Sequence, residues 1–236
     1  MKYLIIEEPK KQVYIDFIEY AYNKSDVVSF KVITRIAHQK RLKREFNKLC
    51  ALLNKSKEEI IKLYNDPDFI NEAFLNLKHR KGIVGKWTNP LKGIERKINK
   101  NKEEIHKIKE QHIKMDIQNI IFMNAGKFIF DKKMEQIRDF LKEDFIRKES
   151  IIENSRVMND YDIYYYKVSN RIKELLIEQK TLYNMMFPNF PEDIRFFKNN
   201  SCLIETVTHE KLAFIDIENL QEYNDLRVIG LKLKEC

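Results

Sequence analysis

The spacing of hydrophobic residues changes twice along the chain, and this change constrains the fold more than any other feature. Short runs of β-branched and aromatic residues lie near both ends, whereas the residues between them, roughly Ile33 to Asn159, follow a helical spacing. Only five Gly and five Pro occur in 236 residues, which favours long helices over many short strands. Because neither end alone has many strands, we expect the two ends to share one sheet.

The pattern predicts an α+β fold, in which both chain ends form a small, mostly antiparallel sheet and the middle forms a large α-helical insertion. We place a composite α/β domain at residues 1–32 and 160–236, and a basic helical insertion at residues 33–159. The predicted strands are Lys2–Ile6, Val27–Val32, Tyr161–Val168, Ile194–Phe197, Cys202–Thr208, Leu212–Ile217 and Val228–Leu233. The predicted helices of the composite domain are Gln12–Tyr22, Asn170–Met186 and Glu218–Leu226.

The insertion is expected to contain a long helical hairpin. Ser56 and Glu59 have the spacing of a capping box at a helix start. Isoleucines in Ile94–Ile120 recur mainly every three, four or seven residues, and Asn124–Gly126 has the composition of a helix end. A second hydrophobic stripe in Phe130–Phe145 would supply the antiparallel partner helix. The same hairpin could instead support a homo-oligomer through its isoleucines.

Positive charge concentrates in the expected insertion. From Lys31 to Met115 the sequence holds 22 Lys and Arg against 10 Asp and Glu, a balance of +12, although the whole chain carries only +8. The remainder is therefore net acidic. A basic region of this kind favours an anionic partner, which we expect to be a nucleic acid or an acidic protein.

Targeting and cofactor signals are lacking in the sequence. The opening apolar run Tyr3–Ile6 is too short for a signal peptide, and later apolar stretches fall below the roughly 20 residues that a membrane span needs. Three widely spaced cysteines, Cys50, Cys202 and Cys236, indicate neither a disulfide framework nor a cysteine zinc site. We expect a cytoplasmic protein with reduced thiols, no cofactor, no bound metal and no membrane partner.

Both ends of the chain resemble a known group of proteins. The stretch Phe190–Lys198, followed by Cys202–Glu205 and Thr208–Lys211, and the opening Met1–Val32 carry the resemblance. The group consists of uncharacterised cytoplasmic proteins of low-GC Gram-positive bacteria, some of them labelled stage III sporulation protein AH-like. The resemblance implies an insertion into a small α/β domain, and it implies no catalytic residues.

A cluster of cations in the insertion is the first candidate binding site. Its members are Lys40, Arg41, Lys43, Arg44 and Lys48. On a helix this spacing places several cations on neighbouring faces, as contacts to phosphate groups require. The alternative interpretation is an ordinary solvated helix surface.

A second basic segment surrounds two glycines. Arg80 and Lys81 precede Gly82–Lys86, and the only tryptophan, Trp87, follows. The two glycines are spaced as in the loop with which KH domains hold a nucleic-acid backbone, although the flanking elements of that domain are not evident. We therefore consider a turn between helices the more ordinary interpretation, with Trp87 anchoring it.

The third candidate is a titratable cluster, Glu205, His209 and Glu210, in the carboxyl-terminal part of the chain. A histidine beside carboxylates can act as a general base or hold a metal ion. A polar hairpin tip explains the same residues. The H-E-x-x-H zinc motif is excluded because position 213 is Ala.

A run of tyrosines, Tyr161, Tyr164, Tyr165 and Tyr166, forms the last candidate. Tyrosines on a strand can stack bases, as in proteins that bind RNA on a sheet surface. The characteristic RNP sequence of those proteins is missing, so we interpret these residues as part of the core.

These observations favour a non-enzymatic interaction or accessory protein, of the kind found in immunity or defence systems, that binds a nucleic acid or an acidic protein through its basic insertion. The alternative function is a metal-dependent nuclease or another phosphoryl-transfer enzyme that uses Glu205, His209 and Glu210.

Overall fold

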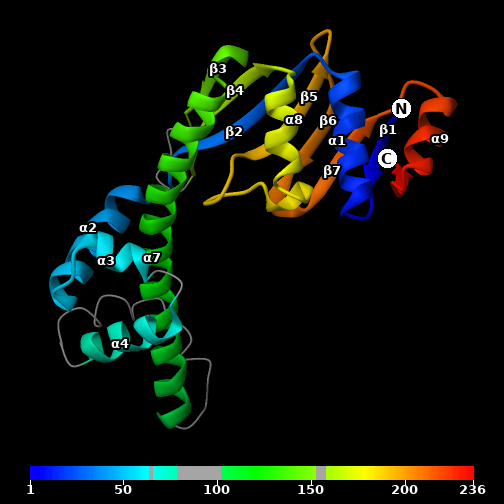
Figure 1. Ribbon diagram of the computed structural model, residues 1–236. Helices are drawn as coiled ribbons and strands as arrows, with labels where there is room; N and C mark the ends of the chain where they lie inside the picture. The colour runs from blue at the N-terminus through cyan, green and yellow to red at the C-terminus, as the bar shows by residue number, and fades with distance from the viewer. Residues whose placement is uncertain (64–65, 79–101, 153–157) are drawn as a thin grey trace. The chain divides into compact units, whose positions relative to one another are not determined.

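The computed structural model describes residues 1–63, 66–78, 102–152 and 158–236, which form an α+β protein with an eight-stranded antiparallel sheet (Figure 1). The strands are β1 (Lys2–Ile5), β2 (Val27–Arg35), β3 (Phe145–Ile151), β4 (Asp160–Lys167), β5 (Glu192–Lys198), β6 (Ser201–Val207), β7 (Leu212–Asp216) and β8 (Leu233–Glu235). The helices are α1 (Gln12–Lys24), α2 (Gln39–Leu53), α3 (Lys57–Lys62), α4 (Pro67–Lys78), α7 (Lys102–Phe140), α8 (Asn170–Ile177) and α9 (Leu220–Val228), with short 3-10 turns η2 (Lys142–Asp144), η3 (Leu182–Asn184) and η4 (Thr208–Glu210).

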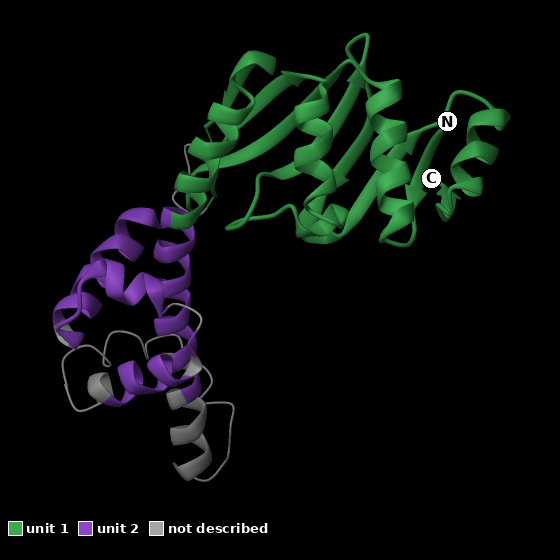
Figure 2. Cartoon of the chain, in the orientation of Figure 1, with its two compact units in different colours: residues 1–37, 129–236 green, residues 38–128 purple. Residues whose placement is uncertain are grey.

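The chain divides into two compact units (Figure 2). Residues 1–37 and 129–236 form the sheet unit, and residues 38–128 form the helical unit.

Strands from both ends of the chain alternate within the sheet. The strand order is β3-β4-β2-β5-β6-β7-β1-β8, with neighbouring strands antiparallel. The two amino-terminal strands therefore occupy interior positions, each between two strands that lie after the insertion. This arrangement confirms the predicted α+β class and the predicted sheet shared by the two ends.

Helices α1 and α8 pack side by side on one face of the sheet (Figure 1). The Tyr14 hydroxyl donates a hydrogen bond to the Leu176 carbonyl at 2.5 Å, and Phe17 is fully buried beneath α1. The Tyr3 ring lies 5.2 Å from the Tyr223 ring, which places α9 against the same face. The apolar stripes of three amphipathic helices thus cover this face.

The predicted boundary at residue 159 is wrong for β3. Residues Phe145–Ile151 were assigned to the helical insertion, but they form an edge strand paired with β4. The side chains of Lys148 and Ser150 both bond the Asp162 carboxylate, at 3.1 and 2.6 Å. Cross-strand polar pairs therefore support a strand that lacks a hydrophobic alternation.

The predicted helical hairpin is replaced by one continuous helix. Helix α7 runs through Asn124–Gly126, where we predicted a helix end, and continues to Phe140. Ala125 is fully buried, and the Nδ2 of the Asn124 side chain donates to the Ile120 carbonyl at 2.8 Å. Burial at Ala125 outweighs the weak helix propensity of its neighbours Asn124 and Gly126.

Most of the predicted stripe residues whose side chains the structure describes are nevertheless buried, whereas Phe145 is exposed. The buried ones are Ile117 and Ile120 of the first stripe and Phe130, Met134, Ile137 and Leu141 of the second. In the helical unit, Ile117 and Ile121 are buried together with apolar residues of α2, α3 and α4. In the sheet unit, the Phe130 ring lies 5.2 Å from the Phe187 ring. Burial of Ile117 and Ile121 within one chain removes the reason for expecting self-association through them.

The capping box at the start of α3 is confirmed. The Glu59 amide donates to the Ser56 hydroxyl at 3.1 Å, and the Ser56 amide donates to the Glu59 carboxylate at 2.7 Å. Because these hydrogen bonds favour the ionised form, they lower the pKa of Glu59.

Within the described residues, no helix combines the length and the apolar character that crossing a bilayer requires.

Candidate nucleic-acid interface

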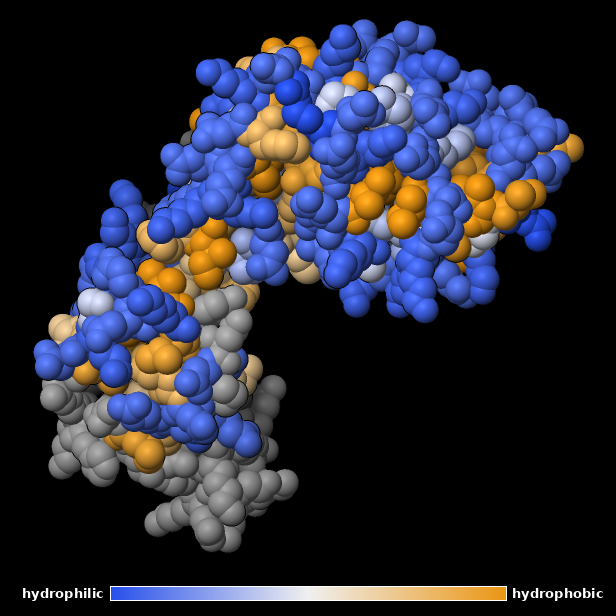
Figure 3. Space-filling view, in the orientation of Figure 1, coloured by the Kyte–Doolittle hydropathy of each residue, from blue (hydrophilic) through white to orange (hydrophobic). Residues whose placement is uncertain are grey.

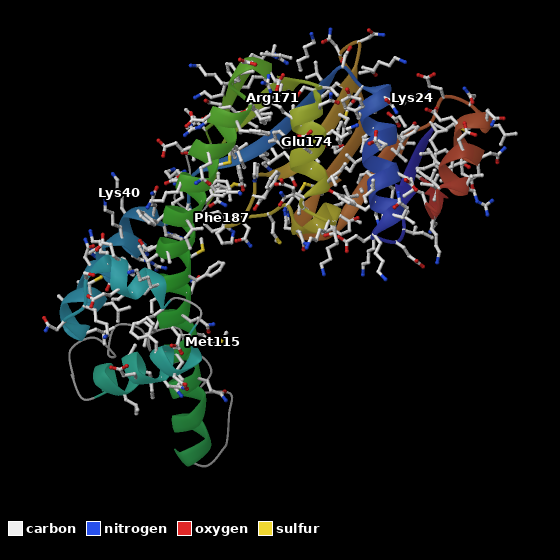
Figure 4. The ribbon with its side chains drawn as sticks, in the orientation of Figure 1. Lys24, Lys40, Met115, Arg171, Glu174 and Phe187 are labelled. Carbon is white, nitrogen blue, oxygen red and sulfur yellow. The ribbon has the colours of Figure 1, made fainter. Side chains whose placement is uncertain are left out.

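Helix α2 presents the predicted cations on its outer surface. Its apolar residues Leu42, Phe46 and Leu49 are buried in the helical unit. The exposed positions include all five predicted cations, namely Lys40, Arg41, Lys43, Arg44 and Lys48. Lys40 extends away from the ribbon in Figure 4, and Figure 3 shows both hydrophilic and hydrophobic residues on this side of the helical unit. We call these five residues the basic face of α2.

Helical spacing aligns most of the basic face. Lys40, Arg44 and Lys48 are four residues apart and form one row along the helix, about 6 Å between successive members. Arg41 lies beside this row, three residues before Arg44. The row therefore presents cations at regular intervals, as an extended polyanion requires.

One carboxylate partly neutralises the row. Glu45 pairs with Arg44 at 3.1 Å and with Lys48 at 3.2 Å. Burial raises the pKa of Glu45, but the hydrogen bonds from Lys48 and Arg44 outweigh burial and leave this pKa below its ordinary value. Among the described residues, Lys40, Arg41 and Lys43 form no ion pair. Positive charge is thus least compensated at the start of α2.

The start of α2 is an unfavourable place for cations. A helix amino terminus carries partial positive charge and favours acidic residues, but the first turn of α2 contains none. The residue before the helix, His38, has a left-handed backbone (φ 57°) and makes no side-chain cap. Lys40 and Arg41 therefore destabilise the first turn of the helix they belong to, a local conflict that is typical of functional sites.

The second predicted basic segment lies outside the described residues. Arg80, Lys81, Gly82–Lys86 and Trp87 fall within residues 79–101. The interpretation of this segment as a phosphate-binding loop or a turn stays a prediction.

The predicted titratable cluster is divided between two sets of contacts. Glu205 lies on β6, where its carboxylate pairs with Arg195 at 2.6 Å and with Lys2 at 3.9 Å. His209 and Glu210 lie in η4, with both side chains more than half exposed and 3.8 Å apart. In the part of the chain that the structure describes, no three His, Cys, Asp or Glu side chains are grouped closely enough to hold a metal ion.

The four tyrosines separate onto the two faces of the sheet. Tyr164 and Tyr166 are buried on the face that the helices cover, as the core interpretation predicts. Tyr161 and Tyr165 point to the opposite face, because side chains alternate along a strand. Both are partly exposed, and the alternation of side chains along the predicted strand is the signal that separates them from Tyr164 and Tyr166.

Comparison with known proteins identifies no relative. No family model matches the chain, and no curated protein or solved structure is detectably similar to it. The resemblance of the chain ends to the bacterial group stays a prediction.

Proposed function

We propose that this protein is a non-enzymatic nucleic-acid-binding protein and that the basic face of α2 contacts the phosphate backbone. The observation that supports the proposal is the set of exposed cations at the start of α2, where the helix dipole opposes them. Such residues lower helix stability and raise affinity for a polyanion. In this proposal the protein is an accessory factor. The immunity or defence systems expected from the sequence are one place where such a factor acts.

A nucleic acid fits this surface better than an acidic protein does. Stable protein interfaces contain a desolvated core of aromatic or aliphatic anchors. The apolar side chains Leu42, Phe46 and Leu49 instead point into the helical unit. A surface that offers charge without an apolar anchor is typical of phosphate contacts.

The alternative enzymatic function finds less support. Glu205, one of the three candidate residues, pairs with two cations on the sheet. His209 and Glu210 lie apart from those cations in η4, so the three residues are not arranged as one catalytic group.

Charge reversal tests the proposal. In the variant Arg41→Glu/Arg44→Glu, we expect affinity for a fluorescein-labelled oligonucleotide to fall about tenfold or more in anisotropy titrations at about 50 mM salt. The slope of log affinity against log salt should become shallower by about two, because two phosphate contacts are lost.

A matched control has the same change in net charge elsewhere. Lys10 and Lys142 are exposed residues of the sheet unit, and Lys10→Glu/Lys142→Glu should reduce affinity much less. Equal loss in the two double variants would show that only net charge matters and would contradict a specific role for α2. Absence of binding by the wild-type chain at about 50 mM salt would refute the proposed function.

A further inference from the structure

One row of side chains crosses all eight strands of the sheet. Each member is the direct cross-strand partner of the next, in the order Arg147, Tyr165, Ser29, Arg195, Glu205, Phe214, Leu4 and Lys234. Direct partners in a sheet point to the same face. With strands about 4.8 Å apart, the row is about 34 Å long.

The row lies on the face opposite the helices. Neighbours of the row residues along their strands make the helix contacts, since Tyr164 accepts a hydrogen bond from Arg138 of α7 and Tyr3 packs against Tyr223 of α9. Side chains alternate between faces, so the row points the other way. We call this surface the open face. Its side chains are at least partly exposed except at Ser29, which is buried: Arg147 is 58% exposed and Arg195 is 39% exposed.

Aromatic rings and cations interleave on the open face. The Arg147 guanidinium lies 4.1 Å above the Tyr165 ring, and the Phe197 ring lies 6.0 Å from Tyr165. Phe214 lies on β7, two strands further along the sheet from Phe197. The ammonium of Lys2, on the next strand β1, lies 4.9 Å above the Phe214 ring. Tyr165 and Phe214 are four strand spacings apart, or about 19 Å. The face thus contains two separate aromatic positions, each with a cation.

The centre of the row is small and polar. Ser29, between Tyr165 and Arg195, is too short to cover its two neighbours. Carboxylates pair with the three cations in the free protein, as Glu149 bonds Arg147 and Glu205 pairs with both Arg195 and Lys2. A phosphate group can replace such a carboxylate as the partner of an arginine.

We propose that the open face binds single-stranded nucleic acid, with bases stacked on Tyr165, Phe197 and Phe214 and phosphates contacting Arg147, Arg195 and Lys2. The inference rests on the proposed nucleic-acid function. It adds a second binding surface and specifies single-stranded nucleic acid as the ligand. A duplex keeps its bases stacked inside, so only unpaired bases can stack on these rings. Alternation of rings and cations across a sheet is the arrangement that a strand of bases and phosphates complements.

Ring removal tests the inference. In Tyr165→Leu/Phe214→Leu, we expect affinity for a labelled thymidine dodecamer to fall about tenfold or more, because each stacked base contributes about 1–3 kcal/mol. Affinity for a duplex of the same length should change less than twofold. Leucine keeps the positions apolar, and unchanged thermal melting confirms folding. Tyr22→Leu is the matched control, because Tyr22 also lies beneath a lysine, at 4.7 Å from Lys173, but on helix α1.

A second variant changes affinity in the opposite direction. Glu205→Gln removes the carboxylate that competes with phosphate for Arg195, so affinity for the dodecamer should rise about threefold. Weaker or unchanged binding in this variant would contradict phosphate contact at Arg195.

The outcomes separate this inference from the proposed function. If the ring variant binds the dodecamer as tightly as wild type does, or loses single-strand and duplex affinity equally, the open-face inference is overturned. The proposed role of α2 then stands if Arg41→Glu/Arg44→Glu still weakens binding. If the ring variant alone loses single-strand affinity, the open face is the binding surface and the role of α2 fails.

Discussion

Glu192 is a buried carboxyl group at the start of β5, only 9% exposed. Burial raises its pKa, and the negative charge of Asp193 raises it further. A hydrogen bond from the Phe187 amide to its carboxylate, at 3.3 Å, and the positive charges of His209 and Lys31 act in the opposite direction. The net effect is a raised pKa, so the folded protein favours the protonated form more than the unfolded chain does.

This raised pKa predicts a specific pH dependence. A carboxyl group whose pKa is higher in the folded state stabilises the protein below its unfolded pKa and loses that stabilisation as pH rises through the folded pKa. Glu192→Gln keeps an oxygen for the Phe187 amide and removes the buried charge. We therefore expect a higher urea midpoint than wild type at pH 7.5 and nearly equal midpoints near pH 4. A lower midpoint at pH 7.5 would show that ionised Glu192 stabilises the fold.

At the scale of elements, α2 combines a stable apolar side with an unfavourable first turn. Replacing Lys40 by Glu places a negative charge at the positive end of the helix dipole. We expect Lys40→Glu to raise the melting temperature by about 1–3 °C while weakening oligonucleotide binding by about threefold to tenfold. Calorimetry and anisotropy titrations measure the two effects on the same sample.

The neighbouring residue supplies the control for this prediction. Gln39→Glu adds a negative charge to the same turn without removing a cation. It should stabilise α2 to a similar extent and weaken binding less than Lys40→Glu does. We infer that the cations at the start of α2 favour binding at the expense of helix stability. A loss of stability in both variants would show that this inference is wrong.

The elements also show which features the sequence could predict. Strands near the chain ends were predictable because β-branched and aromatic runs mark them, and the capping box at Ser56 was predictable because it is local. Strand β3 was missed because Arg147–Glu149 interrupts any alternation, and its partner β4 determines its conformation. The helix end predicted at Asn124–Gly126 failed because burial outweighs local propensity.

The two candidate surfaces differ in the same way. The basic face of α2 was predictable, since residues three and four apart share a helix face. The open face could not be predicted, because its row takes one residue from each of eight strands and depends on their pairing register. Tyr165 was found from sequence only as a member of a tyrosine run, without Arg195 or Phe214.

At the scale of the whole molecule, the sheet unit depends on both ends of the chain. Strands β1 and β2, both within residues 1–37, lie at interior positions of the sheet. The Cys236 amide donates to the Lys2 carbonyl at 3.1 Å, and the two termini lie near each other in Figure 1. The first and last strands therefore form an antiparallel pair that a short linker could join.

A circular permutant tests this topology. Joining Cys236 to Met1 through a short Gly-Ser linker, with new ends between the exposed turn residues Asn199 and Asn200, changes the chain order but keeps every strand pair. We expect a cooperative thermal transition within about 5 °C of wild type, because exposed turns tolerate new termini. Deleting residues 1–37 removes two interior strands and should abolish that transition. A sheet with β1 and β2 at interior positions requires a folded permutant and an unfolded deletion variant. A molten permutant, or a folded deletion variant, would therefore contradict the strand order.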